Sequence, residues 1–245
     1  MSAMTVEAAT LSVAAIVAGA IASVTGFGIG SILTPTLSLW MDAKLAVAVV
    51  AIPHLIGTAL RFAMLDARVD RSVMWRFGIA SAAGGLAGAL LQASLGGDWL
   101  LTLLAALLLF VAALELSGWS RHLRFTGPAA WIAGVSSGFL GGLVGNQGGI
   151  RSAALLGFSL KRDVFVATAT AIALFVDGAR LPIYAASSGR AMWDSRTDIA
   201  VATAGVVGGT ILGTRLLKNI PEHLFRKSVA VVLAVLGIAL LLRRP

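Results

Sequence analysis

The sequence predicts an all-α polytopic membrane protein built from two inverted repeats. Its composition is 58% hydrophobic and 12% charged, with a mean hydropathy of +0.92, which is too apolar for a soluble domain. Apolar runs recur along the whole chain, and many reach the roughly 20 residues that cross a bilayer. Two glycine-rich stretches also interrupt apolar runs at matching places in the two halves.

The apolar segments set the expected helices. Those of about 20 residues can span the membrane, whereas the pieces beside each glycine-rich stretch are shorter. The connections between them are short and polar, for example at residues 66–71, 117–127 and 187–198. The expected segments are residues 8–25, 28–40, 45–65, 73–95, 99–117, 129–144, 149–158, 164–186, 199–217 and 224–242.

The two glycine-rich stretches, residues 26–31 and 145–151, are predicted to break their helices. Each glycine weakens a helix by about 1 kcal/mol relative to alanine. In lipid, unwound backbone is tolerated only where it is buried in protein or lines a watery cavity. Paired breaks in two halves are therefore the best pointer in the sequence to the binding site of a transporter.

The halves repeat at an ungapped offset of 119 residues. This offset aligns Gly26 with Gly145, Gly30 with Gly149, and Arg61 with Arg180. The arginine match is the most informative, because arginine within an apolar helix is costly and rare. A one-residue insertion further on brings Gly88 onto Gly208. We expect a first transmembrane repeat at residues 1–118, a connecting loop at 119–127 and a second repeat at 128–245, within one integral membrane domain.

The basic residues favour one topology. If each broken segment crosses the membrane fully, the basic residues split nine to seven; if each is a re-entrant hairpin, they split eleven to five. The second split is the bias expected of a cytoplasmic face. Each half then has three true crossings, so the copies are inverted and both termini lie outside. The eleven are Arg68, Arg71, Arg76, Arg121, Arg124, Lys161, Arg162, Arg215, Lys218, Arg226 and Lys227.

A half-helix is expected to begin after each break. Its first turn has N–H groups without helical partners and the positive end of the helix dipole, about half a charge, and such an end binds anions. The alternative is that the glycines only allow close helix packing. The predicted substrate-binding residues are Gly26, Gly28, Gly30, Ser31, Thr34, Gly145, Asn146, Gln147, Gly148, Gly149, Arg151 and Ser152.

Arg151 is the most informative of these residues. It lies two positions past Gly149 in an apolar run, with no acidic residue within ten positions on either side. An intramembrane arginine indicates a functional site by default, and its planar fork suits sulfite, a sulfonate or a carboxylate. The alternatives are snorkelling to the membrane surface or a structural ion pair.

Four further residues are candidates for coupling or gating. Asp177 and Arg180 are three positions apart, a spacing that lets them pair on one helix face; alternatively, Asp177 takes up a proton during transport. Arg61 has only Thr58 at the equivalent spacing, so it is free or pairs elsewhere. His54 follows Pro53, where a kink can turn it toward a cavity, although a lone histidine more often serves packing.

Composition also excludes several classes of function. Without cysteine, the chain has no disulfide, thiolate metal site or thiol nucleophile. No His-Glu-x-x-His or Gly-x-Ser-x-Gly motif occurs, so we expect no enzyme, catalytic residue, metal or cofactor. The net charge of +8 lies mainly between apolar segments, as the positive-inside rule requires, and does not predict nucleic-acid binding. The expected partners are the bilayer and a small anion, with a proton or sodium as the candidate coupling ion.

The breaks resemble the paired motif of the TauE/SafE family of sulfite and organosulfonate exporters, in which a glycine, one residue and three glycines precede apolar residues. The first copy departs from this pattern at Ile29 and the second at Gln147 and Arg151. The resemblance covers the whole chain. It implies a secondary transporter that moves sulfite or an organosulfonate across a bacterial inner membrane. An anion channel, or a carrier for a non-sulfur organic anion, is the alternative.

Overall fold

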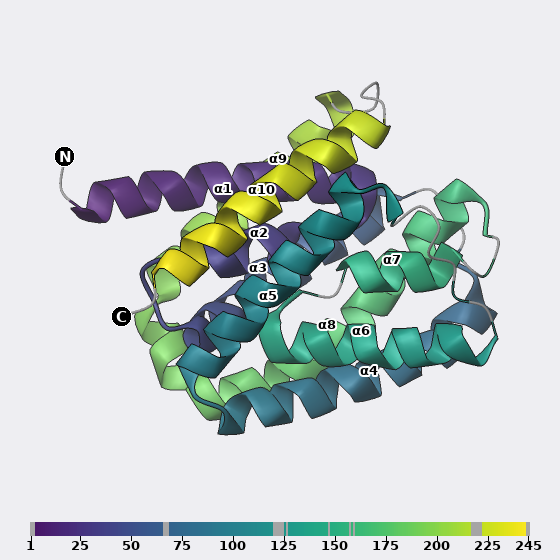
Figure 1. The fold of residues 1–245 in the computed structure, drawn as a ribbon, viewed down its shortest axis with the longest axis horizontal. Coiled ribbons are helices and arrows are strands. Elements are labelled where there is room, and N and C mark those ends of the chain that lie inside the picture. The colour runs from purple at the N-terminus through teal and green to yellow at the C-terminus, as the bar shows by residue number, and fades with distance from the viewer. Residues whose placement is uncertain are drawn as a thin grey trace.

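The computed structural model describes residues 3–65, 69–119, 125, 127–146, 148–156, 158, 160–216 and 222–243. Within these ranges every element is a helix, so the predicted all-α class is confirmed (Figure 1). The helices are α1 (Ala3–Thr25), α2 (Ile29–Leu37), α3 (Ala43–Met64), α4 (Arg71–Ser94), α5 (Gly97–Leu116), α6 (Pro128–Val144), α7 (Gly148–Leu156), α8 (Arg162–Asp194), α9 (Arg196–Leu216) and α10 (Glu222–Leu242).

Six of the described helices, α1, α3, α4, α5, α8 and α9, are long and apolar enough to cross a membrane. Helices α6 and α10 contain shorter apolar stretches, Pro128–Val144 and Lys227–Leu242. Trp75, Trp99, Trp119 and Trp193 are exposed and lie near helix ends, where amphipathic rings meet the headgroup region. The chain is therefore a multi-pass membrane protein.

The chain reverses direction at each glycine break. Gly26, Gly28 and Gly145 have φ angles of 81°, 131° and 73°, a region that glycine adopts without the steric cost of a Cβ atom. Helix α2 packs against α1, and α7 packs against α6. In Figure 1 both short helices turn back alongside the helix that precedes them. Each broken segment is therefore a helical hairpin in this structure.

The first hairpin begins and ends on the same side of the bundle. The ammonium group of Lys44 donates to the carbonyl of Ala93, and Arg243 Nη1 donates to the carbonyl of Met41 at 3.4 Å. The turns after α2 and α4 therefore lie beside the end of α10. Figure 1 shows both termini on this side. This path is the one expected of a re-entrant hairpin, and the inverted relation of the two halves stays a prediction.

The packing between helices follows a reciprocal pattern. Helix α1 packs against α9 as α6 packs against α4, and α3 against α9 as α8 against α4, while α3 packs on α8 and α5 on α10. Small residues allow the close approaches: a Cβ atom at Gly19 would overlap the carbonyl of Val206, and one at Gly138 would overlap that of Ser81. Exchanging the halves converts α1–α9 into α6–α4 and α3–α9 into α8–α4, and it leaves the pairs α3–α8 and α5–α10 unchanged. The reciprocal packing favours a division into two repeats, and their boundaries at 1–118 and 128–245 stay a prediction.

The later helices correct the expected alignment of the halves. Helices α3 and α8 begin 119 residues apart, but α4 and α9, like α5 and α10, begin 125 residues apart. Gly88 therefore corresponds to Gly213, and the predicted match with Gly208 was wrong. The contacts agree, because a Cβ atom at Gly88 would meet Phe139 and one at Gly213 would meet Ala20, and these two neighbours are themselves 119 residues apart.

The extra residues belong to α8, which has 33 residues where α3 has 22. Residues 187–198 were predicted to be a connection, yet the helix continues to Asp194. A helix that leaves the apolar layer loses its hydrophobic signal but keeps its backbone hydrogen bonds. The polar composition of this stretch therefore marks an extension of the helix.

We expect Arg71→Cys and Lys161→Cys to be labelled from the same face of the membrane, and Arg196→Cys from the opposite face. All three positions are exposed, at the starts of α4, α8 and α9, and the native chain has no cysteine. A membrane-impermeant maleimide applied to intact and to opened cells measures the side of each. Labelling of Arg71→Cys and Lys161→Cys from opposite faces would contradict the re-entrant path.

Candidate functional site

The two glycine breaks lie against each other inside the helix bundle. The hydroxyl of Ser31 donates to Asn146 Oδ1 at 2.7 Å, across 115 residues of sequence. A Cβ atom at Gly30 would overlap the carbonyl oxygen of Gly145, and one at Gly148 would overlap the side chain of Phe27. Gly30 and Gly148 thus permit close contacts between the two breaks that a larger residue would prevent. The sequence separation gives no hint of how close these stretches come.

Helix α2 begins at this contact without a side-chain cap. Its N-cap residue is Gly28, and the first helical hydrogen bond runs from the N–H of Ile32 to the carbonyl of Gly28 at 3.1 Å. The N–H groups of the first turn consequently have no partner within the helix. Every residue of α2 is buried. Helix α7 begins at Gly148, so both half-helices start at the breaks as predicted.

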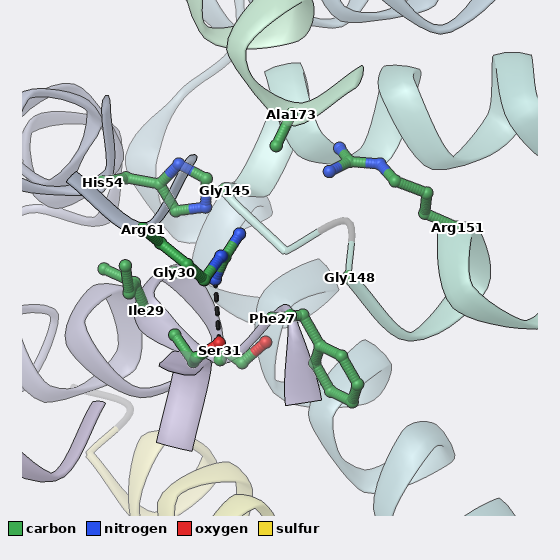
Figure 2. A pocket seen from close by; sticks show the side chains of 13 residues that line it. Phe27, Ile29, Gly30, Ser31, His54, Arg61, Gly145, Gly148, Arg151 and Ala173 are labelled. Carbon is green, nitrogen blue, oxygen red and sulfur yellow. Dashed lines mark hydrogen bonds between the residues drawn. The ribbon is translucent and has the colours of Figure 1, made fainter. Parts of the chain in front are cut away.

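A narrow cavity lies between the two breaks (Figure 2). It is tight: the space open to the centre of a water-sized molecule is about 10 Å³. The predicted residues that line it are Gly26, Gly28, Gly30, Ser31, His54, Arg61, Gly145, Gly148 and Arg151. Sequence reasoning did not select Ala22, Phe27, Ile29 and Ala173, which also line it, because apolar side chains in a largely apolar chain give no distinguishing signal.

Other predicted residues lie away from the cavity wall. Asn146 sits behind Ser31, and its amide nitrogen is buried without a partner. The hydroxyl of Thr34 is also buried and unpaired, beside Gly145. Gly149 belongs to the first turn of α7, and Ser152 is half-buried on the same helix, outside the lining. Gln147 lies outside the described residues.

Arg151 is a buried cation without a matching acid. Its side chain is 4% exposed, so it does not snorkel to the surface. Nη1 donates to the carbonyl of Ala169 at 3.5 Å, while Nε and Nη2 have no partner among the residues that the structure describes. Figure 2 shows its guanidinium reaching toward Ala173 at the cavity. No ion pair of Arg151 occurs in the described part of the chain. Such a charge is costly unless something in the cavity pairs with it.

Arg61 and Arg180 make the same contact in the two halves. Arg61 Nη1 donates to the carbonyl of Ala22 at 2.9 Å, and Arg180 Nη1 donates to that of Gly141 at 2.6 Å. Each carbonyl lies 39 residues before its arginine. Each also accepts the N–H of the glycine that opens the break, Gly26 or Gly145, at 3.0 Å. The two arginines therefore bind the carboxyl ends of α1 and α6, where the helix dipole favours a cation.

Their remaining contacts differ. Arg61 Nε donates to the hydroxyl of Thr170 at 3.1 Å. Arg180 contacts Asp177 Oδ1 through Nε at 3.0 Å and Nη2 at 2.8 Å, which confirms the pair predicted from their spacing. The second carboxylate oxygen of Asp177 lies 2.7 Å from His54 Nδ1. The sequence did not predict this contact, because it depends on the packing of α3 against α8.

The charges around the cavity do not balance. The described residues there supply three arginines, at positions 61, 151 and 180, and one carboxylate, Asp177. With His54 neutral, two positive charges are in excess. No group of three or more acidic, histidine or cysteine side chains gathers in the described part of the chain. The arrangement can therefore attract and hold an anion.

We expect Gly30→Ala to destabilise the protein and to reduce anion binding, because the added Cβ atom would overlap the backbone of Gly145. Overpacking of this kind costs about 1–3 kcal/mol. The matched control is Gly208→Ala in α9, where an added Cβ atom meets nothing within 4 Å. Thermal unfolding in detergent and ligand binding measure both effects. If Gly30→Ala has the same thermal stability and the same anion affinity as Gly208→Ala, the close contact between Gly30 and Gly145 is contradicted.

Comparison with known proteins identifies the family. A family profile described as "Sulfite exporter TauE/SafE" matches residues 11–240, a range that contains both glycine breaks. No curated protein and no solved structure matches the chain. Because the profile covers nearly the whole sequence, the chain belongs to the TauE/SafE family of sulfite exporters, which are membrane transporters.

Proposed function

We propose that this protein is a secondary transporter that carries sulfite or an organosulfonate across the bacterial inner membrane. The observation that carries the proposal is Arg151, a buried guanidinium with unpartnered N–H groups at a cavity between two helix starts. Membership of the TauE/SafE family supports a sulfur-containing oxyanion as the substrate class.

The donors around the cavity suit an oxyanion with several oxygens. The unpaired N–H groups at the start of α2 would bind one oxygen, as helix starts bind phosphate or sulfate. The planar fork of Arg151 would bind one or two others. Ser31 also lines the cavity, but its hydroxyl hydrogen is donated to Asn146, so in this arrangement it offers the anion no donor. A cation would meet the excess positive charge, so we propose that the site selects anions.

We assign direct contact with the anion to those predicted substrate-binding residues that line the cavity. These are Gly26, Gly28, Gly30, Ser31, Gly145, Gly148 and Arg151. Arg61 and Arg180 hold the ends of the broken helices and contribute their charge from there. In this proposal Thr34 and Ser152 serve packing, since neither lines the cavity. The basic face that contains Arg71 and Lys161 is the cytoplasmic one.

We expect purified protein in proteoliposomes to transport labelled sulfite or a labelled organosulfonate with saturable kinetics. Saturation follows from a single small site that must release one anion before it binds the next. Flux that stays proportional to concentration would instead indicate a channel. The panel includes chloride and small carboxylates, which tests a carrier for other anions. Absence of flux for every anion in the panel would rule out the proposal.

We expect Arg151→Ala to lower the affinity for the anion by about ten- to a hundredfold. A hydrogen bond to a charged group contributes about 1.5–3 kcal/mol, and about 2.8 kcal/mol is a hundredfold in affinity. The affinity of Arg151→Lys should lie between those of the wild type and Arg151→Ala, since lysine keeps the charge but lacks the planar fork of the guanidinium. Binding to detergent-purified, monodisperse protein measures the series.

The matched control is Arg190→Ala, which removes an exposed arginine of α8. Ile32→Ala is a second control, because Ile32 is aligned with Arg151 in the other half and carries no charge. Both should affect affinity far less than Arg151→Ala. If folded Arg151→Ala binds the anion as tightly as the parent, Arg151 has a structural role and recognition depends on the helix starts.

A further inference from the structure

We propose that the anion binds together with one proton and that His54 is the residue that holds this proton. The inference rests on the proposed function, because it concerns the same cavity. His54 lines the cavity from α3, and its ring is bonded to Asp177 of α8. Through this pair the site gains a group whose charge changes when it binds a proton.

The two edges of the His54 ring face different partners. Nδ1 lies 2.7 Å from Asp177 Oδ2, and a carboxylate only accepts hydrogen bonds, so Nδ1 carries a hydrogen. On the other edge, Cδ2 is 3.7 Å from the position of a Cβ atom at Gly30, at the start of α2. Figure 2 shows one ring nitrogen directed into the space beside Arg61 and Gly145. Nε2 therefore faces the place where the anion is expected.

An oxyanion at the start of α2 would favour the protonated ring. In neutral His54 with Nδ1 protonated, Nε2 is an acceptor, and an anion oxygen is also an acceptor, so the two would repel. After protonation Nε2 donates a hydrogen bond to the anion, while Asp177 continues to accept from Nδ1. The charged ring then donates a hydrogen bond to a negative group on each side, to Asp177 from Nδ1 and to the anion from Nε2. Both of these hydrogen bonds are charge-assisted.

Without a bound anion, the charged groups around the cavity disfavour the protonated form of His54. The charged groups that face His54 are Asp177 and Arg180 of α8, Arg151 of α7 and Arg61 of its own helix. The sequences of α2 and α6, which also pack against α3, contain no charged residue. Those of α5 and α9 carry their charged residues near their ends, at Asp98, Glu115, Arg196, Asp198 and Arg215. A proton on His54 would add to an existing excess of positive charge, which only the anion offsets.

Anion binding and proton binding therefore strengthen each other, as thermodynamic linkage requires. The affinity for the anion should rise as the pH falls through the range in which His54 titrates. The limiting slope is about tenfold in affinity for each pH unit when one proton is taken up per anion. During transport the anion and the proton would move together, so a pH gradient would drive the flux.

The test measures proton uptake on binding of methanesulfonate to the purified full-length protein. This anion stays ionised at every pH used, so any proton taken up belongs to the protein. Calorimetry in two buffers with different heats of ionisation gives the number of protons per anion. We expect a value near one for the wild type at the midpoint of its pH dependence. We expect none for His54→Gln, whose affinity should not vary with pH.

Two further sets of variants make the outcome specific. His54→Asn places an amide near Nδ1 and can keep the contact with Asp177, so it should fold and also lose the uptake. The controls are His122→Gln and His223→Gln, which remove the other two histidines of the chain and should retain it. If methanesulfonate binds to the wild type without proton uptake, or if the His54 variants keep the uptake, the inference is overturned. If neither methanesulfonate nor sulfite binds to the wild type, the proposed function itself fails.

Discussion

Unwound backbone inside a membrane must find its hydrogen bonds within the protein, and the centre of this fold follows from that constraint. At each break a single carbonyl, of Ala22 or Gly141, accepts both the N–H of the glycine that opens the break and an arginine Nη1. The arginine comes from the next long helix of the same half. In this fold each helix break is therefore accompanied by a buried arginine that binds the end of the broken helix.

That structural solution also gives the cavity its charge. Arg61 and Arg180 are bonded to backbone, so their positive charge remains even though their N–H groups are occupied. Asp177 offsets one of these charges and Arg151 adds another. In a medium of low dielectric constant, such an imbalance acts strongly on any ion in the cavity. The preference for anions is therefore partly a consequence of how the breaks are stabilised.

The equivalent positions of the two halves share a scaffold but differ in chemistry. At an offset of 119 residues, His54 corresponds to Ala173, Asp177 to Thr58, and Arg151 to Ile32. Gly26 and Gly30 are paired with Gly145 and Gly149, and the two arginine contacts are paired as well. In the described part of the chain, the His54–Asp177 pair and a buried cavity arginine without an acidic partner occur once each. Backbone that must be satisfied in lipid constrains both halves alike. Side chains that face the cavity are free of that constraint, so a single lopsided site can form on a duplicated fold.

Features that depend on the local backbone could be predicted from the sequence, whereas contacts between side chains of the two halves could not. The breaks, the helix starts at Ile29 and Gly148, and the Asp177–Arg180 pair could be predicted because each depends on residues close in sequence. The contact of His54 with Asp177 spans 123 residues and depends on how the halves pack, for which an apolar helix surface gives no sequence signal. The six-residue shift between α4 and α9 was missed for a related reason, since a helix that extends into water no longer shows its period as hydrophobicity. Sequence therefore predicts where the backbone must be broken and where charge is available, while the partner of each charge is set by the contact between the halves.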